Sequence, residues 1–245
     1  YNFFEIYRRF YELPLLLHYG APMAQNPVIV TLMDLLALPS DDPNGPMAFR
    51  RRDLLDVLRS PYLAVPGLDT VAVDLLDRIS REKQVLAGRQ NWLDAIDSAG
   101  EDYYDEDGER YPALLSLDAA MNLHTDLDTF FTQTAMPPQG TLSDYVQRLE
   151  DLIGPDPIHN PEDDPAEDEP QPHESYTLNI PRCIRAISER SDVEHLINRD
   201  AVALNQFKDL LSGMLSTQEF LRSALQDQVA STSWASLFSS IRNSI

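Results

Sequence analysis

Apolar residues recur at intervals of three and four along most of the chain, which is the period of an amphipathic helix. The segments with this pattern are 2–12, 27–38, 51–59, 70–80, 88–96, 114–135, 142–153 and three segments between 191 and 241. A short apolar run at 15–19 lacks the helical period and predicts a strand. The pattern therefore predicts a mainly α fold of many helices, with one short N-terminal strand segment.

Several of these helices begin with residues that satisfy the free amide groups of a first turn. Asn26 precedes Pro27, so an amide cap is followed by a proline at the first helical position. Residues 141–144 (TLSD) predict another capped start. Residues 191–194 (SDVE) and 216–219 (STQE) have the spacing of capping boxes, and they predict the starts of two separate helices.

Three further segments are predicted to be loops or a linker. Residues 39–48 are rich in turn-forming residues, and residues 101–111 (EDYYDEDGERY) are acidic and polar, so both predict loops. Residues 155–174 contain six prolines and eight acidic residues with almost nothing apolar. Such a segment cannot bury enough surface to offset chain entropy, and it predicts a flexible linker or insertion.

The segment 49–63 (FRRRDLLDVLRSPYL) is the most distinctive in the chain. Its leucines fall on one side of a helix and its arginines on the other, and Ser60, which precedes a proline, predicts the helix end. Arg52 and Asp56 are four residues apart, the spacing of a weak surface ion pair. On spacing alone, the segment is also explained by an ordinary amphipathic surface helix.

The net charge of −21 is distributed unevenly. Residues 1–100 hold 10 basic and 13 acidic side chains (−3), residues 101–174 hold 2 and 20 (−18), and residues 175–245 hold 7 and 7 (0). The dense basic cluster consists of Arg50, Arg51, Arg52 and Arg59. A chain this acidic is not expected to bind polyphosphate avidly, so any nucleic-acid contact must be local.

The sequence contains no recognisable catalytic motif. Lys83 and Lys208 are the two lysines, and neither follows the glycines of a phosphate-binding loop. The histidines and Cys183 lack metal-ligand spacing, so we expect no catalytic residue and no metal site. One cysteine suits a reducing compartment, and no apolar run is long enough to cross a membrane. These features predict a cytoplasmic protein without a membrane partner.

Several stretches together resemble a known family. Residues 10–36 resemble the passage of UvrD-like helicases in which a RecA-like domain gives way to an inserted helical subdomain. Residues 49–63 are similar to the F-x-R-R-x-V-L-x-L-L-R-S-P-Y segment in the B subunit of AddB/RexB-type ATP-dependent helicase/deoxyribonucleases, and residues 79–93 resemble that family's G-x-x-x-W stretch. The resemblance covers about three quarters of the chain, and its most specific part is 49–63. The segments 101–111 and 155–174 have no counterpart and resemble lineage insertions.

The resemblance implies a piece of a subunit that processes DNA double-strand breaks in repair and recombination. It implies four parts: residues 1–26 as the edge of a RecA-like helicase domain, 27–154 and 175–245 as two parts of a helical subdomain, and 155–174 as a linker. In such proteins the ATP and magnesium sites of the motor and the iron–sulfur nuclease domain lie elsewhere. We therefore expect no cofactor in this chain.

Two functional hypotheses follow, and a third is kept open. The first is a scaffold and DNA-guiding element in which Arg50, Arg51, Arg52 and Arg59 contact phosphates; the alternative for these arginines is pairing with Asp53, Asp56 or the acidic insertions. The second is a protein-interaction module that docks a helicase–nuclease partner subunit without touching DNA. The third, a free-standing enzyme of unrecognised type, would require a deep pocket lined by carboxylates with shifted acidity.

Overall fold

The structure is a computed structural model that describes residues 23–39, 42–104, 110–154, 180, 194–225 and 231–245. Four sequence predictions lie outside these residues: the helix at 2–12, the strand at 15–19, the linker at 155–174 and the capping serine at 191. The division of the chain into four parts remains a prediction.

The described residues are mainly helical, which confirms the predicted fold class. They form a short 3-10 helix, η1 (Met23–Gln25), and eight α-helices. The α-helices are α2 (Pro27–Ala37), α3 (Arg51–Leu58), α4 (Thr70–Glu82), α5 (Arg89–Ala99), α6 (Leu117–Thr134), α7 (Leu142–Ile153), α9 (Glu194–Leu225) and α10 (Trp234–Ser244). None of these described helices combines the length and apolar character needed to cross a membrane.

Two of the predicted helix starts are confirmed in atomic detail. The Asn26 side chain accepts a hydrogen bond of 2.9 Å from the amide of Val28 at the start of α2. At the start of α7, the Thr141 hydroxyl accepts from the amide of Asp144, and the Asp144 carboxylate accepts from the amide of Thr141. Both starts depend on residues within four positions of each other, which is why the sequence predicted them.

The loop prediction for 101–111 is wrong at its ends. Strands β1 (Tyr103–Tyr104) and β2 (Arg110–Tyr111) pair antiparallel, with Tyr103 opposite Tyr111. Asp102 holds this hairpin closed, because its carboxylate accepts hydrogen bonds from the Arg110 guanidinium at 2.9 Å and the Ala113 amide at 3.0 Å. A second pair, β3 (Gln139–Gly140) with β4 (Thr232–Ser233), joins segments far apart in the sequence.

The capping box predicted at 216–219 is also wrong, because α9 continues through it. The Ser216 hydroxyl donates to the Ser212 carbonyl at 3.0 Å, and the Thr217 hydroxyl donates to the Gly213 carbonyl at 2.8 Å. Both hydroxyls thus bond backward along a continuous helix rather than capping a new one. The two predicted helices form one element of 32 residues.

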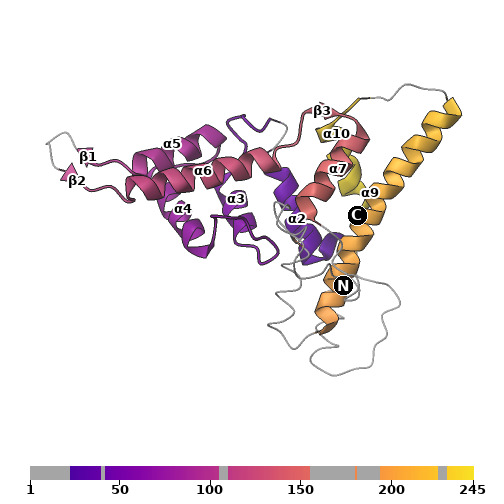
Figure 1. Cartoon of the computed structure of the whole chain (residues 1–245), viewed down its shortest axis with the longest axis horizontal. Helices are drawn as coiled ribbons and strands as arrows, with labels where there is room; N and C mark the ends of the chain where they lie inside the picture. The colour runs from indigo at the N-terminus through magenta and orange to yellow at the C-terminus, as the bar shows by residue number, and fades with distance from the viewer. Residues whose placement is uncertain (1–22, 40–41, 105–109, 155–179, 181–193, 226–230) are drawn as a thin grey trace, which may run out of the picture.

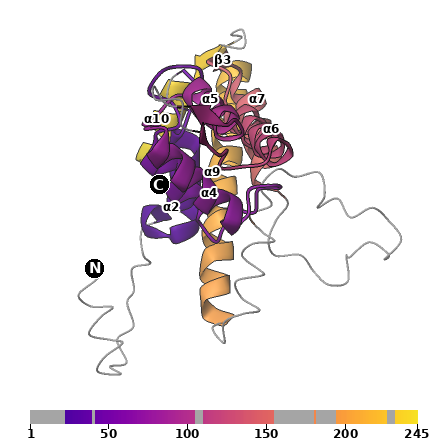
Figure 2. The same ribbon diagram turned by 90° about the vertical axis from the view of Figure 1, so that its left-hand side faces the viewer.

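All eight described α-helices contribute side chains to one hydrophobic core. In Figure 1, α3 to α6 and the β1–β2 hairpin occupy one end, whereas α7, α9 and α10 occupy the other. Helix α2 lies between them and contacts both α3 and α9. Figure 2 shows α9 as a long rod whose N-terminal turns extend below the rest of the bundle.

A candidate interaction site around the basic segment

Two of the four predicted DNA-binding arginines are bound to an aspartate on a neighbouring helix. The Arg51 guanidinium pairs with Asp77 of α4, and its Nε donates to the Ser80 hydroxyl at 2.8 Å. The Arg59 guanidinium lies 3.2 Å from carboxylate oxygens of both Asp74 and Asp77. These ion pairs fasten both ends of α3 to α4.

Asp77 is the centre of this network, and it also accepts from the Arg81 guanidinium at 2.7 Å. Its side chain is 12% exposed. Burial alone would raise the pKa of Asp77, but hydrogen bonds and charges from Arg59, Arg81 and Arg51 outweigh that effect and lower it. Asp77 is therefore a carboxylate held in its charged form by three cations.

The other two arginines of the cluster remain at the surface. The Arg52 guanidinium lies 3.7 Å from Asp56, and the two side chains are 89% and 68% exposed, which confirms the predicted weak pair. Arg50 is exposed, and among the described residues its guanidinium has no ion pair or hydrogen bond. The expectation that these arginines pair with Asp53 or Asp56 holds for Arg52 alone within this part of the chain. DNA contact by any of them stays a prediction.

Phe49 sets the position of the cluster by an unusual backbone conformation. Its φ of 51° lies in the left-handed region, which is rare for a bulky residue. The ring is fully buried, with its centroid 4.1 Å from that of Phe131. The backbone is satisfied on both sides: its amide donates to the Leu38 carbonyl at 2.7 Å, and its carbonyl accepts from the Trp92 indole at 2.9 Å. The chain thus turns sharply from the core to the exposed arginines.

The segment that carries Phe49 is hydrogen-bonded to the loop between α4 and α5. The Arg51 amide donates to the Leu86 carbonyl at 2.9 Å, and the Gly88 amide donates to the Ala48 carbonyl at 2.7 Å. Gly88 has a φ of 95°, a conformation that favours glycine. These bonds leave two apolar side chains facing outward: Met47 is 55% exposed and Leu86 is 80% exposed.

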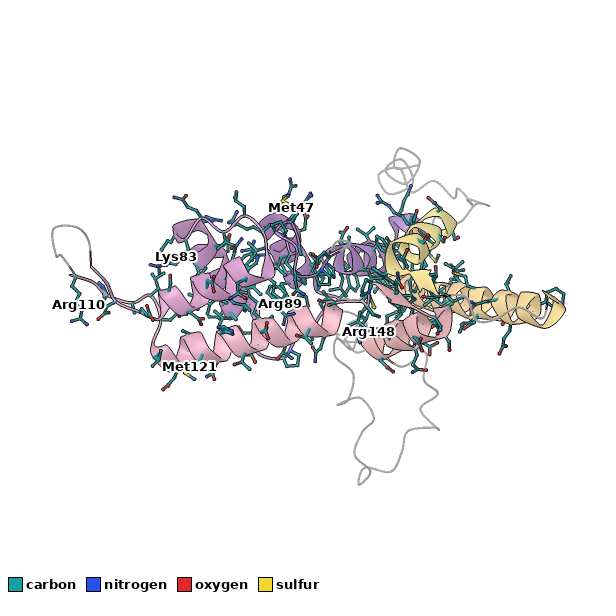
Figure 3. All side chains as sticks on the ribbon, turned by 90° about the horizontal axis from the view of Figure 1, so that it is seen from above. Met47, Lys83, Arg89, Arg110, Met121 and Arg148 are labelled. Atoms are coloured by element: carbon teal, nitrogen blue, oxygen red, sulfur yellow. The ribbon has the colours of Figure 1, made fainter. Side chains whose placement is uncertain are left out.

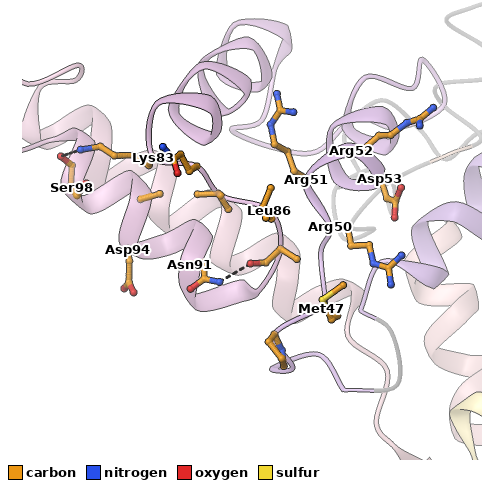
Figure 4. Close-up of a pocket in the computed structure, with 15 residues that line it drawn as sticks. Met47, Arg50, Arg51, Arg52, Asp53, Lys83, Leu86, Asn91, Asp94 and Ser98 are labelled. Carbon is orange, nitrogen blue, oxygen red and sulfur yellow. Dashed lines mark hydrogen bonds between the residues drawn. The ribbon is translucent and has the colours of Figure 1, made fainter.

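The two segments border an open groove of about 1180 Å³, which we call the arginine groove (Figure 4). It is lined by Pro46, Met47, Arg50, Arg51, Arg52, Asp53, Lys83, Gln84, Val85, Leu86, Ala87, Asn91, Asp94, Ala95 and Ser98. The guanidinium groups of the three consecutive arginines point in different directions. At the end of this view away from the arginines, the Lys83 ammonium donates to the Ser98 carbonyl at 3.3 Å.

The C-terminal end of the segment 49–63 is hydrogen-bonded to α9. The Tyr62 hydroxyl donates to the Asp200 carboxylate at 2.9 Å, and the Asn26 amide donates to the other oxygen of Asp200 at 3.0 Å. Arg199 also donates to Asp200 at 2.9 Å. Burial of the phenol and its hydrogen bond to Asp200 raise the pKa of Tyr62 to about 12. We call residues 49–63 the junction segment, because they connect α2, α4, α5 and α9 with α3.

Sequence reasoning identified the junction segment but missed its partners. Asp77 lies four residues before Arg81, a spacing that is typical of an ion pair within one helix. That spacing gives no indication of the ion pairs that Arg51 and Arg59 make with Asp77 from the junction segment. Asp200 is separated from Asn26 by 174 positions, and no local pattern connects them. Met47 and Leu86 lie in loops, where apolar periodicity gives no prediction.

The acidic and metal-ligating side chains of the described residues bear on the metal-site and enzyme hypotheses. Within the described ranges, histidine, cysteine and acidic side chains do not gather in any group of three or more that could hold a metal ion. The acidic side chains that line the arginine groove are those of Asp53 and Asp94. No protein-family model, curated protein or solved structure matches this chain.

Proposed function

We propose that this chain is a non-catalytic helical scaffold in a subunit that processes DNA double-strand breaks, similar to the B subunit of AddB/RexB-type helicase/exonucleases. One observation carries the proposal: the junction segment, which is also the most specific part of the resemblance, is where five helices are held together. The distinctive sequence of the junction segment is thus explained by assembly of the bundle rather than by chemistry at a reacting centre.

The contacts of the junction segment are structural at both ends. Arg51 and Arg59 form ion pairs with Asp77, and the Tyr62 hydroxyl donates a hydrogen bond to Asp200. A residue that bridges two helices through a mostly buried carboxylate is poorly placed to exchange that partner for a ligand, because the carboxylate would lose its compensation. We therefore assign Arg51 and Arg59 to the scaffold and leave Arg50 and Arg52 for binding.

The binding role that the groove favours is docking of a partner subunit. Protein interfaces combine a few apolar side chains with arginine, and Met47 and Leu86 lie beside Arg50 in this groove. The charged phosphate backbone of duplex DNA offers no apolar surface against which Met47 and Leu86 could pack. The net charge of −21 also opposes association with duplex DNA, a long polyanion that extends well beyond a local basic site.

The scaffold role is tested in the full-length protein assembled with its partner subunits. Degradation of blunt duplex DNA that requires ATP is expected for the wild-type assembly, and its absence would overturn the assignment to a break-processing enzyme. Asp77→Ala is expected to lower the yield of assembled complex, because it loosens the junction. Turnover per assembled complex is expected to stay unchanged, whereas its loss would mean that this chain takes part in catalysis.

A second candidate, DNA guidance, is favoured by the exposure of Arg50 and Arg52. If both contact phosphates, replacing them with alanine should weaken binding of blunt duplex DNA and reduce the slope of log K against log salt by about 1.8. Arg78→Ala is the matched control, because Arg78 is an exposed arginine that pairs with Glu82 outside the groove. An unchanged affinity and slope would end the DNA role.

A further inference from the structure

We infer that the arginine groove is the docking site for an acidic segment of a partner protein, which places an apolar side chain against Met47 and Leu86. This inference rests on the proposed scaffold function and names the kind of partner that the scaffold holds. It depends on the charge of the groove, on its exposed apolar side chains and on the rigidity of its walls.

The groove is a basic site in an acidic chain. Its lining includes four basic residues and two acidic ones, whereas the chain as a whole has a net charge of −21. Arg51 is paired with the mostly buried Asp77, so the exposed side chains of Arg50, Arg52 and Lys83 supply the cations that a ligand can meet. The weak surface pair of Arg52 with Asp56 and the hydrogen bond of Lys83 to the Ser98 carbonyl leave both cations exposed to solvent. Carboxylates of a partner would complement them, and the surrounding negative charge would repel acidic proteins that do not fit this site.

The apolar component distinguishes this groove from a simple basic patch. Isolated apolar side chains on a surface are ordinary and need no explanation. Met47 and Leu86, however, come from different loops and line the same groove next to the cations. Met121, another exposed apolar residue, projects from the opposite side of the molecule (Figure 3), so the exposed apolar residues do not form one continuous surface.

The walls of the groove are held in place before any ligand arrives. The hydrogen bonds from Arg51 to Leu86 and from Gly88 to Ala48 fix the backbones beside both apolar side chains. The buried ring of Phe49 anchors the same loop to the core. A preformed site loses little conformational entropy on binding, so a short segment can be held with useful affinity. Methionine adds an adaptable apolar surface.

The test uses the full-length protein as bait for a display library of short random peptides, with counter-selection on the Arg50→Glu/Arg52→Glu variant. The selected peptides are expected to carry several acidic residues around an apolar one. By fluorescence anisotropy, Arg50→Glu/Arg52→Glu and Leu86→Ser should each weaken binding of a selected peptide about tenfold or more. Thermal unfolding of every variant checks that the fold is intact.

Two matched controls separate the groove from the rest of the surface. Arg78→Glu changes an exposed arginine outside the groove, and Val71→Ser changes a side chain that is 74% exposed and also outside it. Both should bind the peptide like wild type. The inference is overturned if no peptide is selected, if the selected peptides are not acidic, or if the groove variants bind them normally.

A short blunt DNA duplex is tested as a competitor in the same assay. Binding of the duplex that depends on Arg50 and Arg52 but not on Leu86 would identify a DNA site and overturn the peptide inference. The scaffold proposal is judged separately, by the assembly and turnover of the Asp77→Ala complex. The inference about the groove can therefore be overturned while the scaffold proposal is supported.

Discussion

At the scale of single residues, Asp77 is the side chain on which the junction depends most. Replacing it with asparagine keeps its shape but leaves Arg51, whose side chain is 29% exposed, without a counter-charge. We expect the free energy of unfolding at neutral pH to fall by about 2–3 kcal/mol, somewhat less than for a fully buried pair, because Arg59 and Arg81 are more exposed. Asp74→Asn, which affects one exposed ion pair, should cost no more than about 0.5 kcal/mol. Urea unfolding measures both variants.

The same substitution should have a defined pH dependence. The pKa of Asp77 is lowered in the folded state from its ordinary value of 3.8, so its contribution is fully present above that value. It is lost as the pH falls through the lowered pKa. The difference in unfolding free energy between wild type and Asp77→Asn should therefore shrink in acid. A difference that stays constant down to about pH 2 would contradict the ion-pair account.

Tyr62 makes the opposite prediction, at high pH. Its pKa is raised from 10.0 to about 12, so the neutral phenol is the form that stabilises the fold. That contribution is fully present below pH 10.0 and is lost as the pH rises towards about 12. Tyr62→Phe should lower the unfolding free energy by about 1 kcal/mol at neutral pH, and the gap to wild type should close in alkali. The pH dependence of chemical unfolding measures the gap, and a gap that widens would refute the hydrogen bond to Asp200.

At the scale of secondary-structure elements, the sequence predicted helices that depend on neighbouring residues, but it did not predict contacts between segments that are distant in the chain. The helices α2, α4, α6 and α7 follow from apolar periodicity, and the starts of α2 and α7 also follow from capping residues a few positions away. The pairing of Gln139 with Ser233 could not be predicted, because it depends on where two distant segments meet. The left-handed backbone conformation of Phe49 could not be predicted for the same reason. Its carbonyl accepts a hydrogen bond from Trp92 and its ring packs against Phe131, and both residues lie on other elements.

Two glycines show how the effect of a glycine-to-alanine substitution depends on whether the added β-carbon meets a neighbouring helix. Gly213 lies within α9, and a β-carbon there would meet nothing within 4 Å, so Gly213→Ala should stabilise the protein by about 0.5–1 kcal/mol. Gly100 ends α5 with an ordinary φ of −83°, but a β-carbon there would lie 2.8 Å from that of Ala120. Gly100→Ala should therefore destabilise it by about 1–3 kcal/mol. Thermal unfolding of both variants checks the signs, and equal effects would contradict the close packing of α5 on α6.

At the scale of the whole molecule, the two ends are linked by α2 and by the junction. Helix α2 packs against α3 on one side and α9 on the other. The hydrogen bonds of Asp200 to Asn26 and Tyr62 connect the same parts through polar groups. Figures 1 and 3 show the C-terminal turns of α9 extending beyond the other helices, so the cooperative part of α9 is expected to be the part that contacts α2 and α7.

The two tryptophans of the chain allow this linkage to be tested, because each lies at one end. Trp92 is buried in α5, and Trp234 is buried in α10 with its ring centroid 5.5 Å from that of Tyr145. The single-tryptophan variants Trp92→Phe and Trp234→Phe each report on the opposite end by fluorescence. Since both ends share one core, each variant's fluorescence midpoint in urea should coincide with its own circular-dichroism midpoint. Fluorescence of Trp234 that changes well before or after the loss of helix would mean that the ends unfold independently, and the junction segment would then be too weak to serve as a scaffold.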